Sequence, residues 1–334
     1  MKLLKSVVFS LFLLCCCVSL MGLSNKPSIV AFKHNPDVAE FAKDYAKKHQ
    51  KNEKQILALL SKAEYKQSII DAISRPAESV LEWKDYSKIF LKLKRVKKGV
   101  AFWKKHQAAL LKVSQLYQVD PEVIVAILGV ETWYGENQGS FRVLDALMTL
   151  SFHYPKRAKF FKKELEHFLL LIDEQKLDGT QLKGSYAGAM GYGQFMPSSY
   201  RAYAKSYKGN GPVDIWHNPE DAIASIANYL HEHHWRYGDL IALQLPIKNI
   251  KQDWLSKKLK PVKVVGDYNS LFKLPASVST KAPVTLMEMQ GHYGKEYWFG
   301  FNNFYVISRY NISRLYSLSV FQLSQLIKFE MSII

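Results

Sequence analysis

Apolar side chains recur every three or four positions through most of the chain as far as about residue 235, which is the spacing of one face of an α-helix. The pattern predicts these helices: Val38–His49, Glu53–Lys62, Ala101–Tyr117, Pro121–Glu131 and, approximately, 156–174, 197–207 and 219–235. Asp120, Pro121 and Glu122 mark one start clearly, because an acidic N-cap, a proline in the first turn and a second acid all favour a helix N-terminus.

The helical spacing of apolar residues ends at about 240. From there to about 306, short segments of β-branched or aromatic residues are separated by Pro, Gly and Asp. Such segments are typical of antiparallel strands. We expect strands at 262–265, 278–280, 284–287 and 297–299, and a helix again at Ser313–Ile327. The predicted fold class is therefore mainly α (α+β), with a small antiparallel β lobe.

The first 24 residues have the pattern of a signal peptide. Lys2 and Lys5 precede an apolar stretch from Val7 to Met21, and Gly22 and Ser24 are small residues at positions −3 and −1 of a cleavage site. The stretch is shorter than the roughly 20 residues of a membrane-spanning helix. We predict export to the periplasm. An uncleaved anchor, and lipid attachment to the outer membrane at one of the cysteines 15–17, stay open as alternatives.

Composition narrows the classes of function. All three cysteines lie at 15–17, so the body of the protein has none for a disulfide, a zinc site or a nucleophile. The net charge of +17 calls for anionic surroundings. For an exported protein these are phospholipid, teichoic or lipopolysaccharide groups, or the peptide carboxylates of peptidoglycan, and not nucleic acid. Basic clusters at 92–98 and 257–260 belong to this surface, and the alternative is that both are solvated helix or loop faces.

Glu131 is the candidate catalytic acid. It shares one helix stripe with Ile124, Ile127 and Leu128 and stands at the C-terminal end of that helix. Burial and the negative end of the helix dipole both disfavour a charged carboxylate there. Such a group stays protonated near neutral pH and can donate its proton to a leaving oxygen. The alternative is that Glu131 reaches solvent or pairs with a cation such as Arg142.

The segment from Gly184 to Ser198 contains four glycines interleaved with Tyr, Met, Gln and Phe. It lacks the Lys-Ser/Thr of a phosphate loop and the glycine spacing of a dinucleotide site. Glycines allow a ligand to approach the backbone closely, while rings and an amide can face it. We therefore expect the floor of a sugar-binding cleft.

Three stretches carry a resemblance to a known family: Ile127-Leu-Gly-Val-Glu-Thr-Trp-Tyr-Gly135, 144–157 and 184–200. Together with 308–313 and 320–325, they resemble the membrane-bound lytic murein transglycosylase B family. The resemblance implies cleavage of the MurNAc–GlcNAc bond of peptidoglycan by a lysozyme-like helical core. It also implies the following organisation: signal peptide 1–24, helical lobe 25–110, catalytic core 111–240, β lobe 241–306, and a C-terminal segment 307–334 that returns to the core.

The resemblance also implies residue roles. Glu131 would be the sole catalytic acid/base, and Ser185 and Asn311 would contact the sugar near the scissile bond. Further positions match glycan- or peptide-contacting residues: Tyr86, Lys156, Arg157, Gln194, Phe195, Tyr229 and Tyr310. Lys156 replaces a more common Arg, which weakens a bidentate contact with a carboxylate there. For Tyr229, ordinary core packing is an equal alternative.

No metal or other cofactor is expected. The family often carries an EF-hand-like calcium loop, here 206–217, but Ser206, Lys208 and His217 stand at ligand positions that favour carboxylates. Asp221, just beyond the loop, could still supply a carboxylate, although Asn218 lengthens the loop by one residue. His231 and His234 could share a helix face, yet no third ligand is near in sequence, so a solvated helix end is the preferred interpretation. We expect a monomer whose partners are glycan strands and their stem peptides.

The leading hypothesis is non-hydrolytic cleavage, in which Glu131 protonates the glycosidic oxygen and then accepts the proton of the C6 hydroxyl as a 1,6-anhydro ring closes. Ordinary glycosidases need a second carboxylate. A hydrolytic muramidase that uses Glu136 or Asp145 is therefore the first alternative. A catalytically silent peptidoglycan-binding protein is the second.

Overall fold

Helices dominate the computed structural model, which describes residues 32–74, 81–247, 249–269 and 278–333. The predicted signal peptide and the three cysteines lie outside the described residues. The α-helices are α1 Pro36–His49, α2 Glu53–Leu60, α3 Gln67–Ile73, α4 Trp83–Phe90, α5 Leu93–Lys105, α6 Gln107–Tyr117, α7 Pro121–Thr132, α8 Val143–His153, α9 Ala158–Glu174, α10 Pro197–Tyr203, α11 Pro219–Glu232, α12 Asn302–Tyr310 and α13 Arg314–Ser332. The strands are β1 Phe141–Arg142, β2 Lys183–Gly184, β3 Ala242–Leu245, β4 Lys263–Val264, β5 Pro283–Gly291 and β6 Gly294–Gly300.

The predicted helices are present, but α8 was missed and α10 ends at Tyr203, before the predicted 207. Two further differences concern α5, α6 and α7. The expected helix over 101–117 is broken at His106, where α5 ends and α6 begins. Asp120 is the N-cap residue of α7, but its side chain does not cap the helix. It accepts instead from Trp235 Nε1 at 2.8 Å, because the chain after α11 packs against the start of α7.

Helix α7 lies at the centre of the helical part of the fold. Every residue from Glu122 to Val130 is buried, because α5, α6, α11 and α13 all pack against it. A helix enclosed in this way must be apolar on all sides. The sequence of α7, Pro-Glu-Val-Ile-Val-Ala-Ile-Leu-Gly-Val-Glu-Thr, meets that requirement except at its two ends. Glu131 therefore sits where α7 leaves the core.

The sheet of the β lobe has the strand order β3-β6-β5-β4, with antiparallel pairing. In its register Leu286 pairs with Phe299 and Leu245 pairs with Tyr297, and these apolar residues form a second core with Tyr268. The strands expected at 284–287 and 297–299 are present and longer than predicted, and only 263–264 of the one at 262–265 is a strand. The prediction at 278–280 is wrong, while β3 and α12 were missed.

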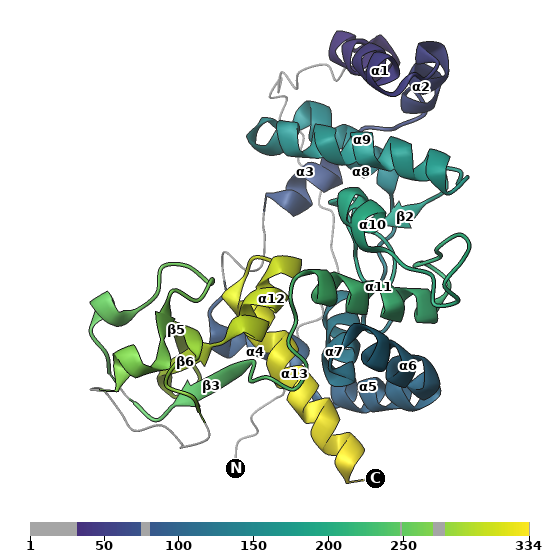
Figure 1. The fold of residues 1–334 in the computed structure, drawn as a ribbon. Coiled ribbons are helices and arrows are strands. Elements are labelled where there is room, and N and C mark those ends of the chain that lie inside the picture. Colours follow the sequence, from purple (N-terminus) through teal and green to yellow (C-terminus); the bar gives the residue numbers. More distant parts are fainter. Residues whose placement is uncertain (1–31, 75–80, 248, 270–277, 334) are drawn as a thin grey trace, which may run out of the picture. The chain divides into compact units, whose positions relative to one another are not determined.

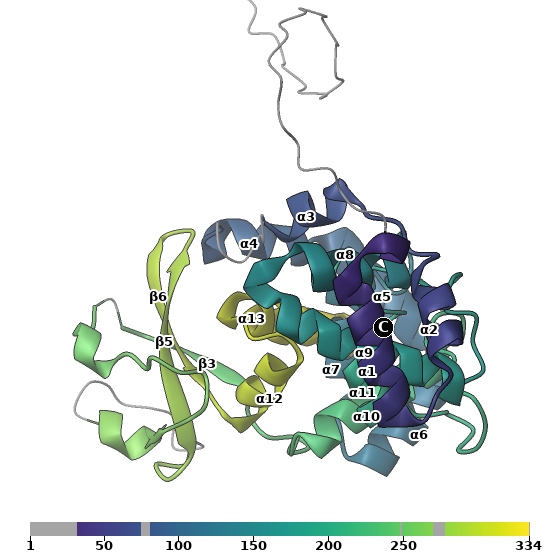
Figure 2. The ribbon, with the colours of Figure 1, turned by 90° about the horizontal axis from the view of Figure 1, so that it is seen from above.

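Helices α12 and α13 connect the β lobe to the rest of the fold. In two views at right angles they lie between strands β3, β5 and β6 on one side and α5, α7 and α11 on the other (Figures 1 and 2). Helix α13 packs along α4, α5 and α7, which come more than 180 residues earlier in the chain. The predicted class, mainly helical with a small antiparallel lobe, is confirmed. In the described residues, no helix is long and apolar enough to cross a membrane.

Candidate active site

The backbone turns sharply directly after Glu131. Trp133, Tyr134 and Gly135 all have left-handed conformations, with φ of 55°, 62° and 93°. Non-glycine residues rarely adopt this conformation, so the turn needs support from its surroundings. The Tyr134 side chain provides part of it, because its ring lies against Gly129, where any Cβ would collide with it, and its hydroxyl donates to Arg95 O at 2.8 Å.

Arg95 supports the same turn through contacts with Gly129 and Trp133. Its guanidinium donates to the carbonyl of Gly129 and lies 4.0 Å from the centre of the Trp133 ring. Burial lowers the pKa of Arg95 to about 10, so the side chain still carries its charge at neutral pH. A cation at the C-terminal end of α7 stabilises the negative end of the helix dipole. The interpretation of 92–98 as a wholly solvated basic run is therefore wrong for Arg95, which is buried.

The acid-bearing turn is joined to the glycine-rich segment. Thr132 Oγ1 donates to Tyr192 O at 2.8 Å and accepts from Gly135 N at 3.0 Å. The ring of Tyr192 covers Gly135 so closely that a Cβ there would lie 1.9 Å from a ring carbon. The turn after Glu131 and the glycine-rich segment, about 60 residues apart in the sequence, are thus in direct contact. A cleft formed by both motifs requires this contact.

Tyr316 is the polar partner of the candidate acid. Its hydroxyl donates to Glu131 Oε1 at 2.6 Å, and the Glu131 side chain is half-buried rather than fully buried. Burial, and then the charge of Glu131, hold the pKa values of Tyr316 and Tyr310 well above the usual range. Both phenols therefore lie close to the carboxylate and remain hydrogen-bond donors. Sequence reasoning missed Tyr316, which stands five residues after Asn311 with no local motif around it.

We expect Tyr316→Phe to reduce kcat roughly tenfold, because a hydrogen bond to a charged group is among the stronger ones. The lost bond favours the carboxylate over the carboxylic acid. Its removal should move the alkaline limb of the kcat/KM profile, where the acid loses its proton, to higher pH. Tyr237→Phe, at an exposed tyrosine, is the control. An unchanged pH profile would contradict this role for Tyr316.

Ser185 and Gln194 are held rigidly in the glycine-rich segment. Ser185 Oγ accepts from Ala187 N and Ala189 N, at 3.2 and 3.1 Å. Gln194 Nε2 donates to Gln138 O and Gly191 O, so its amide nitrogen supports the loop. Asn311 follows α12 directly and is half-buried. All three remain candidate sugar contacts.

Several predicted contact residues are buried in an aromatic cluster. The Phe195 ring lies 5.6 Å from that of Tyr310 and 6.0 Å from that of Tyr229. The Tyr229 hydroxyl donates to Arg309 O at 2.5 Å and its ring stacks on His233 at 4.2 Å. The packing interpretation of Tyr229 therefore has direct support. Tyr310 in turn donates to Gly193 O, which ties the cluster to the cleft floor.

The remaining predicted contacts lie elsewhere. Tyr86 is buried on α4, its ring 5.1 Å from that of Phe90. Lys156 and Arg157 are exposed and line a separate pocket of about 400 Å³ at the start of α9. Arg157 lies over the Phe160 ring, 4.3 Å from its centre. The structure therefore places these two cations in a pocket that none of the other predicted contact residues lines.

The alternative second acids are already engaged. Asp145 is buried and accepts twice from Arg142, both at 2.8 Å, and from Glu64 N at 2.9 Å. Arg142 therefore belongs to Asp145 and not to Glu131. Glu136 is exposed and forms an ion pair with Lys98. Both carboxylates therefore already have a cationic partner.

The loop expected to resemble a calcium site uses its acids internally. Asp221 accepts from Tyr207 N and Asp214 N, each at 2.9 Å, and Asp214 accepts from Trp216 N and His217 N. In the parts of the chain that the structure describes, no group of three His, Cys, Asp or Glu side chains could hold a metal ion. The residues present therefore do not fit calcium, since hydrogen bonds already occupy the carboxylate oxygens the ion would need.

We expect thermal melts in EDTA and in millimolar calcium to agree within error. A ligand that binds only the folded state must raise the melting temperature, so a clear calcium-dependent increase would show that the loop rearranges to bind the ion. Magnesium at the same concentration controls for ionic strength.

Comparison with known proteins gives consistent matches. The model of the family described as Transglycosylase SLT domain matches residues 33–325. The membrane-bound lytic murein transglycosylase B of Escherichia coli K12 is 39% identical over 304 residues, which cover 88% of this chain and 83% of that one. Among solved structures, catenated SltB1 of Pseudomonas aeruginosa is 43% identical, with a TM-score of 0.85 over 90% of this chain and 99% of its own. SltB3 of Pseudomonas aeruginosa in complex with NAG-NAM-pentapeptide is 27% identical, with a TM-score of 0.77 over 88% and 79%.

Proposed function

We infer that this chain, which belongs to the transglycosylase SLT domain family, is a lytic transglycosylase of peptidoglycan. It cleaves the β-1,4 bond between MurNAc and GlcNAc with formation of 1,6-anhydroMurNAc. The observation that carries the mechanism is the single carboxyl group of Glu131 at the end of α7, in hydrogen bond with Tyr316.

Glu131 acts first as an acid and then as a base. Its proton passes to the glycosidic oxygen as the bond from C1 of MurNAc to that oxygen breaks, which leaves an oxocarbenium-like centre at C1. The carboxylate then accepts the proton of the C6 hydroxyl of the same sugar, whose oxygen bonds to C1 and closes the ring. Tyr316 stabilises the carboxylate between the two steps, because it is a permanent donor to that oxygen.

We assign the other residues to two groups. Ser185, Asn311 and Gln194 contact the sugars from the cleft floor, while Lys156 and Arg157 meet a more distant anionic part of the substrate. The buried aromatic residues Phe195 and Tyr229 pack against Tyr310 and fix its position, and Tyr86 is buried on α4. For this second group, substitution should affect stability as well as substrate binding.

The cellular setting follows from the sequence. Residues 1–24 direct export to the periplasm. The alternative is lipid attachment at Cys15, Cys16 or Cys17, which would anchor the protein to the outer membrane. The boundaries 25–110, 111–240, 241–306 and 307–334 describe the mature chain, and it acts as a monomer. Mass spectrometry of the purified protein from membranes tests the processing site and the anchor together.

Digestion of sacculi in ¹⁸O-water tests the reaction. If the C6 hydroxyl of the substrate is the attacking group, the products are 1,6-anhydromuropeptides and the new MurNAc terminus carries no label. A hydrolase transfers oxygen from water, so labelled, reducible MurNAc ends would assign the chain to the muramidases. Lysozyme digestion under the same conditions is the positive control for labelling. Unchanged sacculi at high enzyme concentration would favour the binding-protein alternative.

A further inference from the structure

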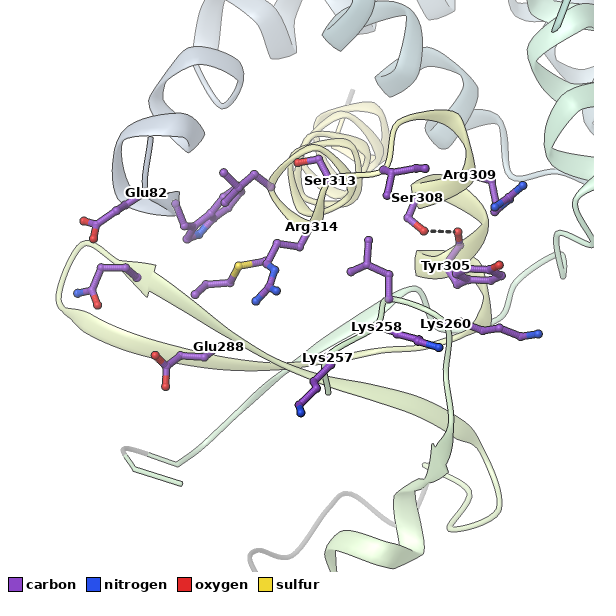
Figure 3. A pocket seen from close by; sticks show the side chains of 16 residues that line it. Glu82, Lys257, Lys258, Lys260, Glu288, Tyr305, Ser308, Arg309, Ser313 and Arg314 are labelled. Carbon is purple, nitrogen blue, oxygen red and sulfur yellow. Dashed lines mark hydrogen bonds between the residues drawn. The ribbon is translucent and has the colours of Figure 1, made fainter. Parts of the chain in front are cut away.

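A pocket of about 700 Å³ lies between the β lobe and the two C-terminal helices. Its walls are the start of α4, the segment 257–260, strand β5 and the turn between α12 and α13 (Figure 3). The segment 257–260 is fastened to β5, because Thr285 Oγ1 donates to Lys258 O and Ser256 N donates to Leu286 O, both at 2.8 Å. All the walls therefore belong to the framework of the fold.

The pocket carries an excess of positive charge. Five exposed basic side chains line it: Lys257, Lys258, Lys260, Arg309 and Arg314. The two acidic lining residues are already neutralised from outside the pocket, Glu82 by Lys84 at 2.7 Å and Glu288 by Lys295 at 3.1 Å. Across the described ranges of the chain, no ion pair joins any of the five cations to a carboxylate.

The charges are also ordered in space. Figure 3 shows Glu82 and Glu288 at one end of the pocket, Lys260 and Arg309 at the other, and Arg314 between them. Arg314 is the first residue of α13, so the positive end of this helix adds to the field of the cations. A concave site with unpaired cations attracts an anionic ligand and gains selectivity from its shape.

The pocket adjoins the segment that carries Tyr310 and Asn311. Ser308 and Arg309 line it directly before these two residues, and Ile312, Ser313 and Arg314 line it directly after them. Tyr310 lies close enough to Glu131 for the charge of the carboxylate to raise the pKa of its phenol. Arg314 and Tyr316 stand two residues apart on α13 and therefore point to different sides of the helix, Arg314 toward the pocket and Tyr316 toward Glu131.

We propose that this basic pocket binds the carboxylate-bearing stem peptide of the glycan strand that is cleaved at Glu131. The proposal rests on the proposed function, which places a peptidoglycan strand beside Tyr316. Arg314 and Lys258 are the principal contacts with the peptide carboxylates. Lipid phosphates are another class of anion around an exported protein, but a flat membrane surface does not fill a concave pocket.

The test compares Lys258→Ala/Arg314→Ala with wild type on two substrates, peptide-bearing glycan strands and the same strands stripped of peptides by an amidase. The readout is the ratio of kcat/KM on the first to kcat/KM on the second. We expect this ratio to fall about 3- to 10-fold, because each exposed ion pair contributes a factor of up to about five. The matched control is Lys97→Ala/Lys281→Ala, at two exposed lysines outside the pocket, and its ratio should equal that of wild type.

A chemically modified substrate tests whether the pocket recognises the charge of the peptide or only its shape. Conversion of the stem-peptide carboxylates to amides should lower the ratio of wild type, and should lower that of the pocket variant by a smaller factor, because only Lys156 and Arg157 are left there to lose a contact. Sedimentation with phosphatidylglycerol vesicles tests the lipid source. If the ratio is unchanged in the variant, the proposal is wrong, and a loss of vesicle binding would then identify a phosphate site. Lys258→Gln replaces the double variant if the latter melts at a lower temperature.

The outcomes also distinguish this proposal from the proposed function. If wild type forms no anhydro products from either substrate, the proposed function fails. If wild type forms them from both and the pocket variant keeps the wild-type ratio, only the peptide site is disproved.

Discussion

Glu131→Gln should abolish measurable turnover of sacculi while the folded protein still binds glycan. The glutamine side chain keeps the size of Glu131 and can still accept from Tyr316, but it has no proton to give and cannot act as a base. Loss of a positioned general acid typically costs about 10²–10⁴-fold. The loss should be larger here, because one group serves both steps.

Glu136→Gln is the matched control for this variant. It removes the same functional group from an exposed position five residues further along, where the carboxylate pairs only with Lys98. Its activity should be close to wild type. Anhydromuropeptide release and the melting temperature should both be recorded for the two variants. Near-wild-type release by a correctly folded Glu131→Gln protein would rule out the catalytic assignment.

Gly135→Ala should destabilise the fold by more than about 3 kcal/mol, because two costs coincide. Its φ of 93° is unfavourable for any residue with a Cβ, and that Cβ would lie 1.9 Å from the Tyr192 ring. Left-handed strain costs about 1–3 kcal/mol and overpacking about the same. The expected result is a clearly lower melting temperature, together with lost activity as the turn after Glu131 moves away from the glycine-rich segment.

Gly209→Ala separates the two costs. Gly209 has nearly the same backbone conformation, with a φ of 89°, but nothing lies within 4 Å of where a Cβ would be. It should show the backbone strain alone and keep its activity. Equal melting temperatures for the two variants would mean that the Tyr192 ring moves aside freely and does not fix the turn.

The sequence predicted those parts of the fold whose pattern is local. Helix periods and an acid at the end of an apolar helix can be read within a dozen residues, and α7 and Glu131 were found in this way. Strand β3 was missed because Ala-Leu-Gln-Leu has little preference for a strand, and pairing with β6 decides its conformation. Tyr316 was missed because nothing near it in sequence indicates a partner 185 residues away.

Arg95 shows the other limit. In the sequence it is one of several cations in a basic run, and exposed runs are usually solvated. In the structure its neighbours Lys94 and Lys97 face solvent while Arg95 is turned inward to Gly129 and Trp133. A single-residue difference of this kind depends on the packing of α5 against α7. It therefore requires the tertiary structure.

The contact between α13 and α7 also determines when the enzyme becomes active during its synthesis. Translation delivers the chain from its N-terminus, so Glu131 is already present while Tyr316 has not yet been made. The two residues are 185 positions apart, and closing long loops is slow and entropically costly. A nascent chain therefore carries its acid without the partner that holds it. We expect full wall-cleaving capacity to arise only after α13 has docked on α7.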